Sequence, residues 1–361
     1  MSLSIRLQTR HESSTGRQLV VLLLSLLAGF VAVGVIFTVK GVNPLYALWK
    51  ILAGSFGSLY GISETITKAI PLILIGSGLT LAFRAKFWNI GAESQLLMGA
   101  IFATWVGLNL GPRLPGWVVI PLMFTLGFVG GAIWGILPAV FKVRFGVNEV
   151  ISTLMLNYVA AEFLNLLIVG PWKGATQQGF PYTDDLPAAA TLAVIPGTRI
   201  HYLTLLIAFA CAVILFFLVY STKFGYELRV VGENPEAARY AGIDFFRTTV
   251  ILMMIGGGVA GLAGVGEAAG IHHHLTYPGV ISAGYGFTAI IVAWLAKLNP
   301  LASIISALFF AGILVGGDAI QISLGLPAAT VHVFNGVLLF FLIMGDTFVN
   351  RRLVVTLGRR S

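Results

Sequence analysis

The sequence predicts an all-α polytopic membrane protein with about ten transmembrane helices, and three observations lead to that prediction. Apolar residues make up 57% of the 361 positions and charged residues only 10%. The mean hydropathy, +0.93, lies well above that of soluble domains. Backbone groups in hydrocarbon must be hydrogen-bonded within their own segment, so the long apolar runs are expected to be helices of about 20 residues.

Ten apolar runs qualify as spans. The first follows Arg10 and Arg17 but is longer than the apolar region of a signal peptide, so an anchor helix is expected there. The eighth and ninth runs are short, and the Asn299-Pro300 turn between them predicts a compressed helical hairpin. The runs are 19–39, 62–83, 90–108, 117–140, 147–169, 203–220, 249–269, 281–296, 301–315 and 328–344.

The basic residues follow this division of the chain. With the N-terminus in the cytoplasm, 16 of the 22 Lys and Arg residues fall in cytoplasmic segments, five in outer segments, and Lys68 within a span. Because basic residues are retained on the cytoplasmic side, both termini are predicted to be cytoplasmic, in the inner membrane of a prokaryote. The net charge of +8 follows from this retention, so membrane lipid is an expected partner and nucleic acid is not.

A single transmembrane domain over 1–361 is predicted, because no stretch long enough for a compact soluble domain remains. Outside the spans lie a cytoplasmic N-terminus at 1–18, an outer loop at 170–200, a cytoplasmic coupling loop at 221–248 and a cytoplasmic C-terminus at 346–361. The outer loop is rich in Pro, Gly and polar residues, which suits a lid or a docking surface. Five spans on either side of it allow an inverted five-plus-five repeat, in which binding sites lie near the membrane midplane.

The most polar stretch, 225–249, contains a predicted short helix. Asn234 suits its N-cap, Pro235 its first position, Glu236 its positive end and Gly242 its termination. Two turns are too few to be stable alone in water, so this helix must rest on another surface. Two interpretations stay open, a solvated connecting loop and a docking helix for a cytoplasmic partner.

Several blocks resemble one family. Glu236-Ala237-Ala238 followed by Gly242 fits the E-A-A-x-x-x-G coupling segment in permease subunits of ATP-binding cassette (ABC) importers. FWNIGAESQLLMGA at 87–100 resembles the N-I-G-A-E-G-Q block of the branch that serves nucleoside and simple-sugar uptake, a branched-chain-amino-acid-type permease family, with Ser94 where glycine is usual. Blocks at 147–158, 224–243, 261–275 and 284–301 resemble the same branch in the same order.

The resemblance implies partners and a coupling site. The coupling segment would seat in a groove of a cytoplasmic ATPase subunit, while a second permease, a copy or a paralogue, and an extracytoplasmic substrate-binding protein would complete the importer. ATP and Mg²⁺ would be used by the ATPase, and no cofactor or metal is expected in this chain. The implied coupling residues are Asn234, Pro235, Glu236, Ala237, Ala238, Arg239 and Gly242.

Motifs for hydrolysis are missing from the sequence. None of the eight lysines follows a glycine, so there is no G-x-x-x-x-G-K-[ST] phosphate loop. Neither H-E-x-x-H nor G-x-S-x-G occurs, which leaves no zinc pair or nucleophile elbow for an intramembrane hydrolase. The sequence therefore predicts a transport subunit rather than an enzyme.

Polar residues inside the spans are candidates for a substrate pathway, because such residues are costly in lipid. In the fifth span Glu149, Thr153, Asn157 and Asn165 recur at steps of four or eight, near one helical face. This stripe either lines a pathway or only joins helices by hydrogen bonds. At the start of the third span, Asn89 and Glu93 lie either beside a substrate or as a helix cap and the partner of a basic residue.

Three further candidates lie near the seventh and eighth spans. The adjacent residues 272–274 are all histidine, but neighbouring side chains point in different directions and make a poor zinc site, so a polar outer rim is expected. Glu267 either binds a solute hydroxyl or satisfies a helix end, and Tyr285 either stacks on a heterocycle or packs. The predicted pathway comprises Asn89, Glu93, Glu149, Thr153, Asn157, Glu267, His272 and Tyr285.

The predicted function is that of an ABC importer permease that translocates a small polar solute, a nucleoside or a related heterocycle or sugar. A proton-coupled secondary transporter with Glu93, Glu149 or Glu267 as a proton relay is the alternative, and a structural membrane scaffold is a third class. The secondary transporter accounts for carboxylates within spans but not for a capped cytoplasmic helix.

Overall fold

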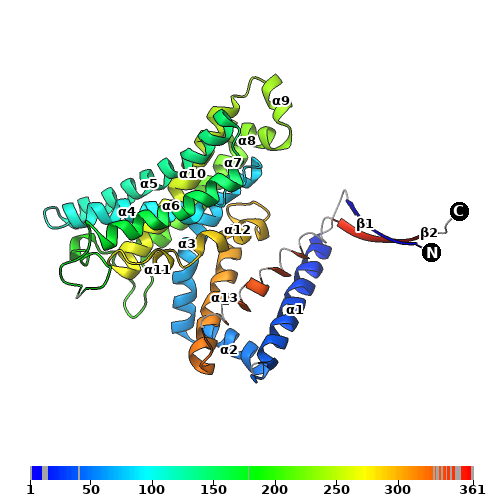
Figure 1. The fold of residues 1–361 in the computed structure, drawn as a ribbon, viewed down its shortest axis with the longest axis horizontal. Helices are drawn as coiled ribbons and strands as arrows, with labels where there is room; N and C mark the ends of the chain where they lie inside the picture. Colours follow the sequence, from blue (N-terminus) through cyan, green and yellow to red (C-terminus); the bar gives the residue numbers. More distant parts are fainter. Residues whose placement is uncertain are drawn as a thin grey trace. The chain divides into compact units, whose positions relative to one another are not determined.

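The computed structural model describes residues 2–9, 15–39, 41–177, 179–327, 330, 333–334, 336–338, 340–341, 344–345 and 351–358. The described chain is predominantly helical (Figure 1). It divides into two compact units, Met1–Gly61 with Gly312–Ser361, and Ile62–Ala311. The expectation of a single domain over the whole chain stays a prediction.

Seven described helices or helix pairs are long and apolar enough to cross a membrane, and the bent pair of α1 (Thr15–Val39) and α2 (Pro44–Phe56) raises the number to eight. The number ten is not confirmed. The run at 90–108 forms a helix that is not among these seven, and the run at 328–344 lies partly outside the described residues. The seven are α3 (Leu59–Arg84), α5 (Gly116–Phe145), α6 (Glu149–Val169), α7 (Tyr202–Ser221), α10 (Phe245–Gly266) with η2 (Glu267–His272), α11 (Pro278–Ser282) with α12 (Tyr285–Leu295), and α13 (Ala302–Leu324).

The helix at 90–108 is α4 (Ala92–Leu110), and its position explains its polar residues. Most of its residues are buried, and it packs against α5, α6, α10 and α12. A helix enclosed by protein does not meet lipid, so polar residues such as Ser94, Gln95 and Thr104 are tolerated where they face other helices.

Glycines bring α4, α5 and α10 into backbone contact. A Cβ on Gly261 of α10 would lie 2.2 Å from the carbonyl oxygen of Gly127 on α5. A Cβ on Gly131 would lie 2.2 Å from the Gly257 carbonyl oxygen, and one on Gly99 of α4 2.2 Å from that of Gly261. These three helices, here called the glycine core, therefore approach more closely than any side chain permits, as small residues allow in membrane bundles.

Links that the sequence places in the cytoplasm meet at one end of the unit Ile62–Ala311. At the end of α3, the Arg84 Nε donates to the Leu298 carbonyl at 2.7 Å, in the link between α12 and α13. The same guanidinium donates to the Tyr220 hydroxyl at the end of α7. Lys142, in the last turn of α5, lies 4.8 Å from the ring centre of Phe87. The helices of this unit therefore alternate in direction as the distribution of basic residues predicts.

The expected pair of helices at 281–296 and 301–315 is confirmed, with a turn at 296–301 between them, but the second helix is not short. The first run is a broken helix, because Ala283 (φ 45°) and Gly284 (φ 73°) adopt left-handed conformations between α11 and α12. The second run is the start of α13, whose 23 residues continue well past 315. The helix is therefore longer than the apolar run at 301–315, because it continues through polar residues such as Asp318.

The unit Met1–Gly61 with Gly312–Ser361 contains a bend and a ribbon. The axes of α1 and α2 differ by 116°, and the Asn43 side chain caps α2 by accepting from two backbone amides. The Ser55 hydroxyl of α2 donates to the Gly312 carbonyl at 2.5 Å. β1 (Ser2–Thr9) pairs antiparallel with β2 (Arg351–Gly358), a departure from the all-α expectation at both predicted cytoplasmic termini.

The glycine core can be tested by adding one methyl group. We expect Gly261→Ala to lower the free energy of unfolding by about 1–3 kcal/mol, the usual cost of overpacking, because its Cβ meets a backbone carbonyl that cannot rotate away. Unfolding by denaturant in detergent micelles measures the change. Gly279→Ala is the matched control, since a Cβ there meets nothing within 4 Å, and equal stability of the two variants would contradict the packing argument.

Candidate functional site

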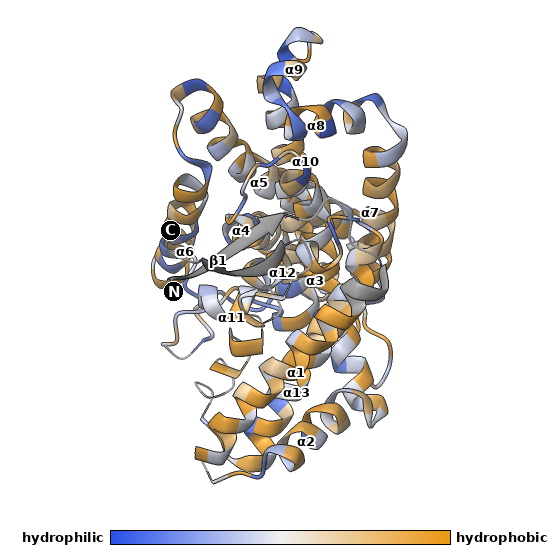
Figure 2. Ribbon diagram, turned by 90° about the vertical axis from the view of Figure 1, so that its right-hand side faces the viewer, coloured by the Kyte–Doolittle hydropathy of each residue, from blue (hydrophilic) through white to orange (hydrophobic). Residues whose placement is uncertain are grey.

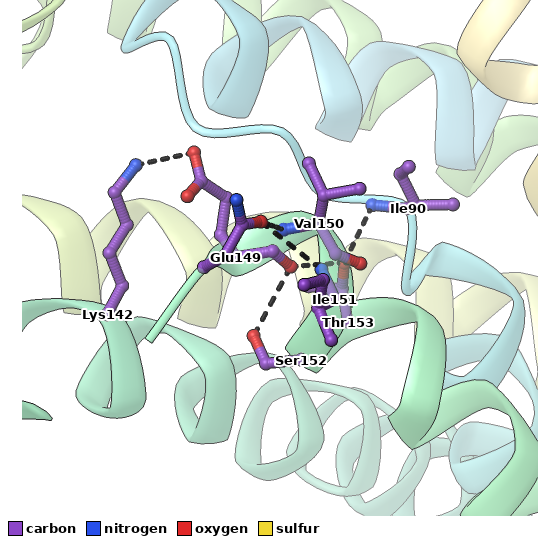
Figure 3. Close-up of polar contacts among 8 residues, drawn as sticks. Ile90, Lys142, Glu149, Val150, Ile151, Ser152 and Thr153 are labelled. Atoms are coloured by element: carbon purple, nitrogen blue, oxygen red, sulfur yellow. Dashed lines mark hydrogen bonds and ion pairs between the residues drawn. The ribbon is translucent and has the colours of Figure 1, made fainter. Parts of the chain in front are cut away.

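The first polar group lies at the start of α6. The Asn148 side chain accepts from the Val150 and Ile151 amides at 2.9 and 3.3 Å and thereby begins the helix. Figure 3 shows the adjacent Glu149 carboxylate beside the Lys142 ammonium, 2.6 Å apart. The charge of Glu149 is therefore paired with Lys142 of α5. Glu149 lies at the edge of the predicted pathway stripe.

Two residues further along α6 hold the link between α3 and α4. The Thr153 hydroxyl accepts from the Ile90 amide at 3.2 Å and donates to the Glu149 carbonyl at 2.6 Å (Figure 3). The Asn157 amide group donates to the Ile90 carbonyl at 3.0 Å, and its oxygen accepts from the Ser94 amide at 3.1 Å. The interhelical hydrogen bonds that sequence analysis left open are thus present, and α6 fixes the point where α4 begins.

Asn89 lies inside this link and does not cap α4. The helix begins at Ala92 with Gly91 as its N-cap, and no side chain bonds to the cap. The Asn89 oxygen accepts from the Gly91 amide at 2.9 Å, and its nitrogen donates to Gln95 at 3.1 Å. Since only 1% of Asn89 is exposed, α4 begins inside the bundle rather than at its surface.

Glu93 joins the start of α4 to the broken helix. Its Oε2 accepts from the Gly286 amide at 2.7 Å, in the first turn of α12. The first amides of a helix lack partners within the helix, and a carboxylate is favoured at that positive end. Tyr285 is buried beside this contact. Glu93 therefore binds the N-terminal end of α12. The basic partner that the sequence offered as an alternative is not the contact that the structure shows.

These contacts gather most of the predicted pathway residues in one place. Asn89, Glu93, Thr153, Asn157 and Tyr285 surround the first turns of α4 and α12, with Glu149 at the edge. We call this group the α4 junction. Asn165 lies outside it, half-buried on α6 and hydrogen-bonded to the exposed Glu162.

Glu267 and His272 form a separate group at the far end of α10. Glu267 is buried and opens the π-helical segment η2, and its Oε2 lies 3.9 Å from the His272 Nε2. His273 contacts the Ala269 carbonyl at 3.1 Å, and His274 lies 3.3 Å from Asp185. The three imidazoles engage three different groups, in agreement with the expectation that they diverge.

Some polar residues near this group were missed from the sequence. Arg199 pairs with Glu64 of α3 at 3.2 Å, and the buried His201 ring lies against Gly266 and Gly270. Charged residues within the second span, Glu64 and Lys68 one turn apart, were the signal that could have found the first pair. His201 precedes α7 in a loop and offers no such signal.

The predicted coupling helix is present as α9 (Pro235–Tyr240). The Asn234 oxygen accepts from the Glu236 and Ala237 amides at 3.0 and 3.1 Å, and Gly242, with φ 72°, follows the helix end. The helix is anchored through Ala238, which is 1% exposed. The predicted N-cap, first position and termination are confirmed. Sequence analysis missed α8 (Lys223–Glu233), the amphipathic helix that precedes it.

The surface of α9 is polar and open. Glu236, Ala237 and Arg239 are exposed, and Tyr240 is 94% exposed. Figure 2 shows hydrophilic residues gathered on α8 and α9, whereas α7 is largely hydrophobic. A bundle of apolar helices with a polar junction inside and a projecting polar helix at one end is the architecture of a membrane transport subunit.

Comparison with known families agrees with this class. The family described as "Branched-chain amino acid transport system / permease component" matches residues 61–343, so this chain belongs to that permease family. A glucose ABC transporter permease protein of Haloferax volcanii is 35% identical, over 94% of this chain and 90% of the relative. The guanosine ABC transporter permease proteins NupP and NupQ of Bacillus subtilis are 32% and 30% identical, over 90% and 69% of this chain and 92% and 79% of their own lengths.

The chain is therefore a permease subunit of an ABC importer, and not an enzyme; ATP hydrolysis belongs to a separate subunit. This result decides against the secondary transporter and the scaffold. The roles of individual residues in the α4 junction and in α9 remain predictions.

The Glu93 contact predicts different effects for two substitutions. Glu93→Ala leaves the buried Gly286 amide without its acceptor, which costs about 1–3 kcal/mol, whereas Glu93→Gln retains a side-chain oxygen. We expect faster amide hydrogen exchange at 284–288 in the alanine variant, with much of the protection restored in the glutamine variant. Glu162→Ala, at an exposed carboxylate of α6, is the control. Unchanged exchange in Glu93→Ala would exclude the contact.

Proposed function

We propose that this chain translocates a nucleoside or a related sugar-bearing solute across the inner membrane of a prokaryote, as one of two permeases in an ABC importer. The similar proteins named for glucose and for guanosine support this solute class, since both solutes contain a polyhydroxylated ring.

The observation that carries the proposal is the geometry of α9. A helix of six residues is unstable alone, yet this one is capped by Asn234, seated through Ala238 and otherwise exposed. Exposed aromatic residues such as Tyr240 are effective anchors at protein interfaces when a partner covers them. An ATPase that uses ATP and Mg²⁺ is the proposed partner, with contacts at Asn234, Pro235, Glu236, Ala237, Ala238, Arg239 and Gly242.

The full assembly follows from this assignment. The second permease is proposed to be a paralogue, because this chain is similar to both NupP and NupQ of one organism. A substrate-binding protein would dock on the outer loop, where Phe180 is exposed. Ten spans arranged as two inverted sets of five, with both termini in the cytoplasm, complete the proposed topology.

Charge reversal on α9 tests the ATPase contact. We expect Glu236→Arg combined with Arg239→Glu to lower recovery of the ATPase with the solubilised chain at least tenfold, because like charges then face the partner. Such a loss corresponds to about 1.4 kcal/mol, within the range for charged interface contacts. Arg113→Glu, on an exposed link at the other end of the bundle, is the matched control. Equal recovery from the α9 variant and the control would reject α9 as the contact.

Uptake tests the energy source and the solute. In cells that express the complete importer, labelled guanosine or glucose should accumulate after the proton gradient is dissipated and should cease to accumulate when ATP is depleted. A tenfold excess of the unlabelled solute should lower accumulation of the label about tenfold. Uptake that follows the proton gradient instead, or that neither solute inhibits, would contradict the proposed function.

A further inference from the structure

A pocket opens where α4 and α6 end, apart from the α4 junction. Its volume is about 610 Å³, and its polar lining comes from Asn109, Trp172, Lys173, Asp184 and Asp185. The segment that supplies most of them precedes α7, and α9 follows α7. Because α7 has 20 residues, it is about 30 Å long at 1.5 Å per residue. The pocket and α9 therefore lie at opposite ends of α7. None of the predicted pathway residues lines this pocket.

The walls of the pocket are held by local structure. Pro112, Pro171 and Pro187 line it, and each proline fixes its own φ angle. The Trp172 amide donates to the Leu167 carbonyl at 2.9 Å, which folds the chain back on the end of α6. A preorganised wall loses little freedom when a ligand binds.

The carboxylates of Asp184 and Asp185 are each held by a neighbouring side chain. The Asp184 Oδ1 accepts from the Thr176 amide at 3.1 Å and from its hydroxyl at 2.6 Å. These hydrogen bonds lower the pKa of Asp184, so the group is ionised at neutral pH and only accepts hydrogen bonds. The Asp185 Oδ1 lies 3.3 Å from the His274 Nδ1, so both carboxylates use one oxygen for support.

The lining combines one flat apolar group with several acceptors. Trp172 is half-buried and offers an indole ring. The Asn109 nitrogen is bonded to the Trp105 carbonyl at 2.8 Å, while its side-chain oxygen has no partner among the described residues. Two carboxylates outweigh the single Lys173, which disfavours phosphate and other anions. A sugar ring has the complementary features, an apolar face of C–H groups and a rim of hydroxyl donors.

We propose that this pocket, lined by Asn109, Trp172, Lys173, Asp184 and Asp185, is a binding subsite for the ring of a neutral sugar, free or as part of a nucleoside. The ring stacks on Trp172, and its hydroxyls donate to Asp184, Asp185 and Asn109. This inference rests on the proposed function, because it places a first contact for the solute before the α4 junction.

Saturation-transfer NMR on the purified full chain in nanodiscs tests the subsite. The probes are D-ribose and D-glucose at about 10 mM, tenfold above an affinity of about 1 mM, with ribose 5-phosphate as the anionic comparison. We expect transfer to the sugar ring protons in the wild type, little transfer to the phosphate ester, and at least a threefold loss in Trp172→Leu. Trp117→Leu is the matched control, because Trp117 is 80% exposed on α5 and does not line the pocket.

Two outcomes would overturn the proposal. Equal transfer in wild type and Trp172→Leu would show that the sugars contact other surfaces, and equal transfer from ribose and its phosphate would remove the charge argument. ATP-driven uptake by the importer separates this test from the proposed function. Absence of transfer to the sugars in the wild-type chain, with uptake intact, rejects the subsite alone, whereas absent wild-type uptake of every sugar-bearing solute rejects the proposed function.

Discussion

The close approach of α4, α5 and α10 is the constraint on which the rest of the structure depends. Lipid gives no hydrophobic drive for one helix to pack on another, so contact area and backbone proximity must stabilise the bundle. Gly99, Gly127, Gly131 and Gly261 supply that proximity. Because α4 is enclosed as a result, it can begin inside the bundle and expose its first amides to the polar groups of the α4 junction.

Local signals predicted much of this architecture from the sequence. The apolar runs located most of the helices, the basic residues gave their directions within the unit Ile62–Ala311, and Asn234, Pro235 and Gly242 located α9. Each of these features depends on residues close together in the chain, or on a simple composition rule. The interactions that produce these features therefore join residues near one another in the chain, where a sequence pattern can reveal them.

Long-range contacts were beyond such signals. Glu93 meets Gly286, 193 positions later, and no pattern in either segment identifies the other. The glycines are visible in the sequence, but which of them face one another depends on how the helices cross. The ribbon of β1 and β2 pairs two short strands from opposite ends of the chain, and an alternating pattern of eight residues does not identify its partner.

A mechanical route follows from these contacts within the proposed importer. After Gly242, the Asp244 side chain accepts from the Arg247 amide at 3.1 Å and begins α10. The glycine core then joins α10 to α4, and Glu93 joins α4 to α12. Force applied by an ATPase at α9 would therefore reach both sides of the α4 junction through helices whose backbones lie in close contact.

The central claim is that the glycine core moves as one body, and a distance measurement tests it most directly. Cys211 is the only cysteine, so spin labels can be placed at Arg113, between α4 and α5, and at Arg247, at the start of α10, in a Cys211→Ser background. We expect the same narrow distance distribution from the importer without nucleotide and from the importer trapped with ATP. A shifted or split distribution in the trapped state would show that α10 slides against α4 and α5, and it would contradict this account.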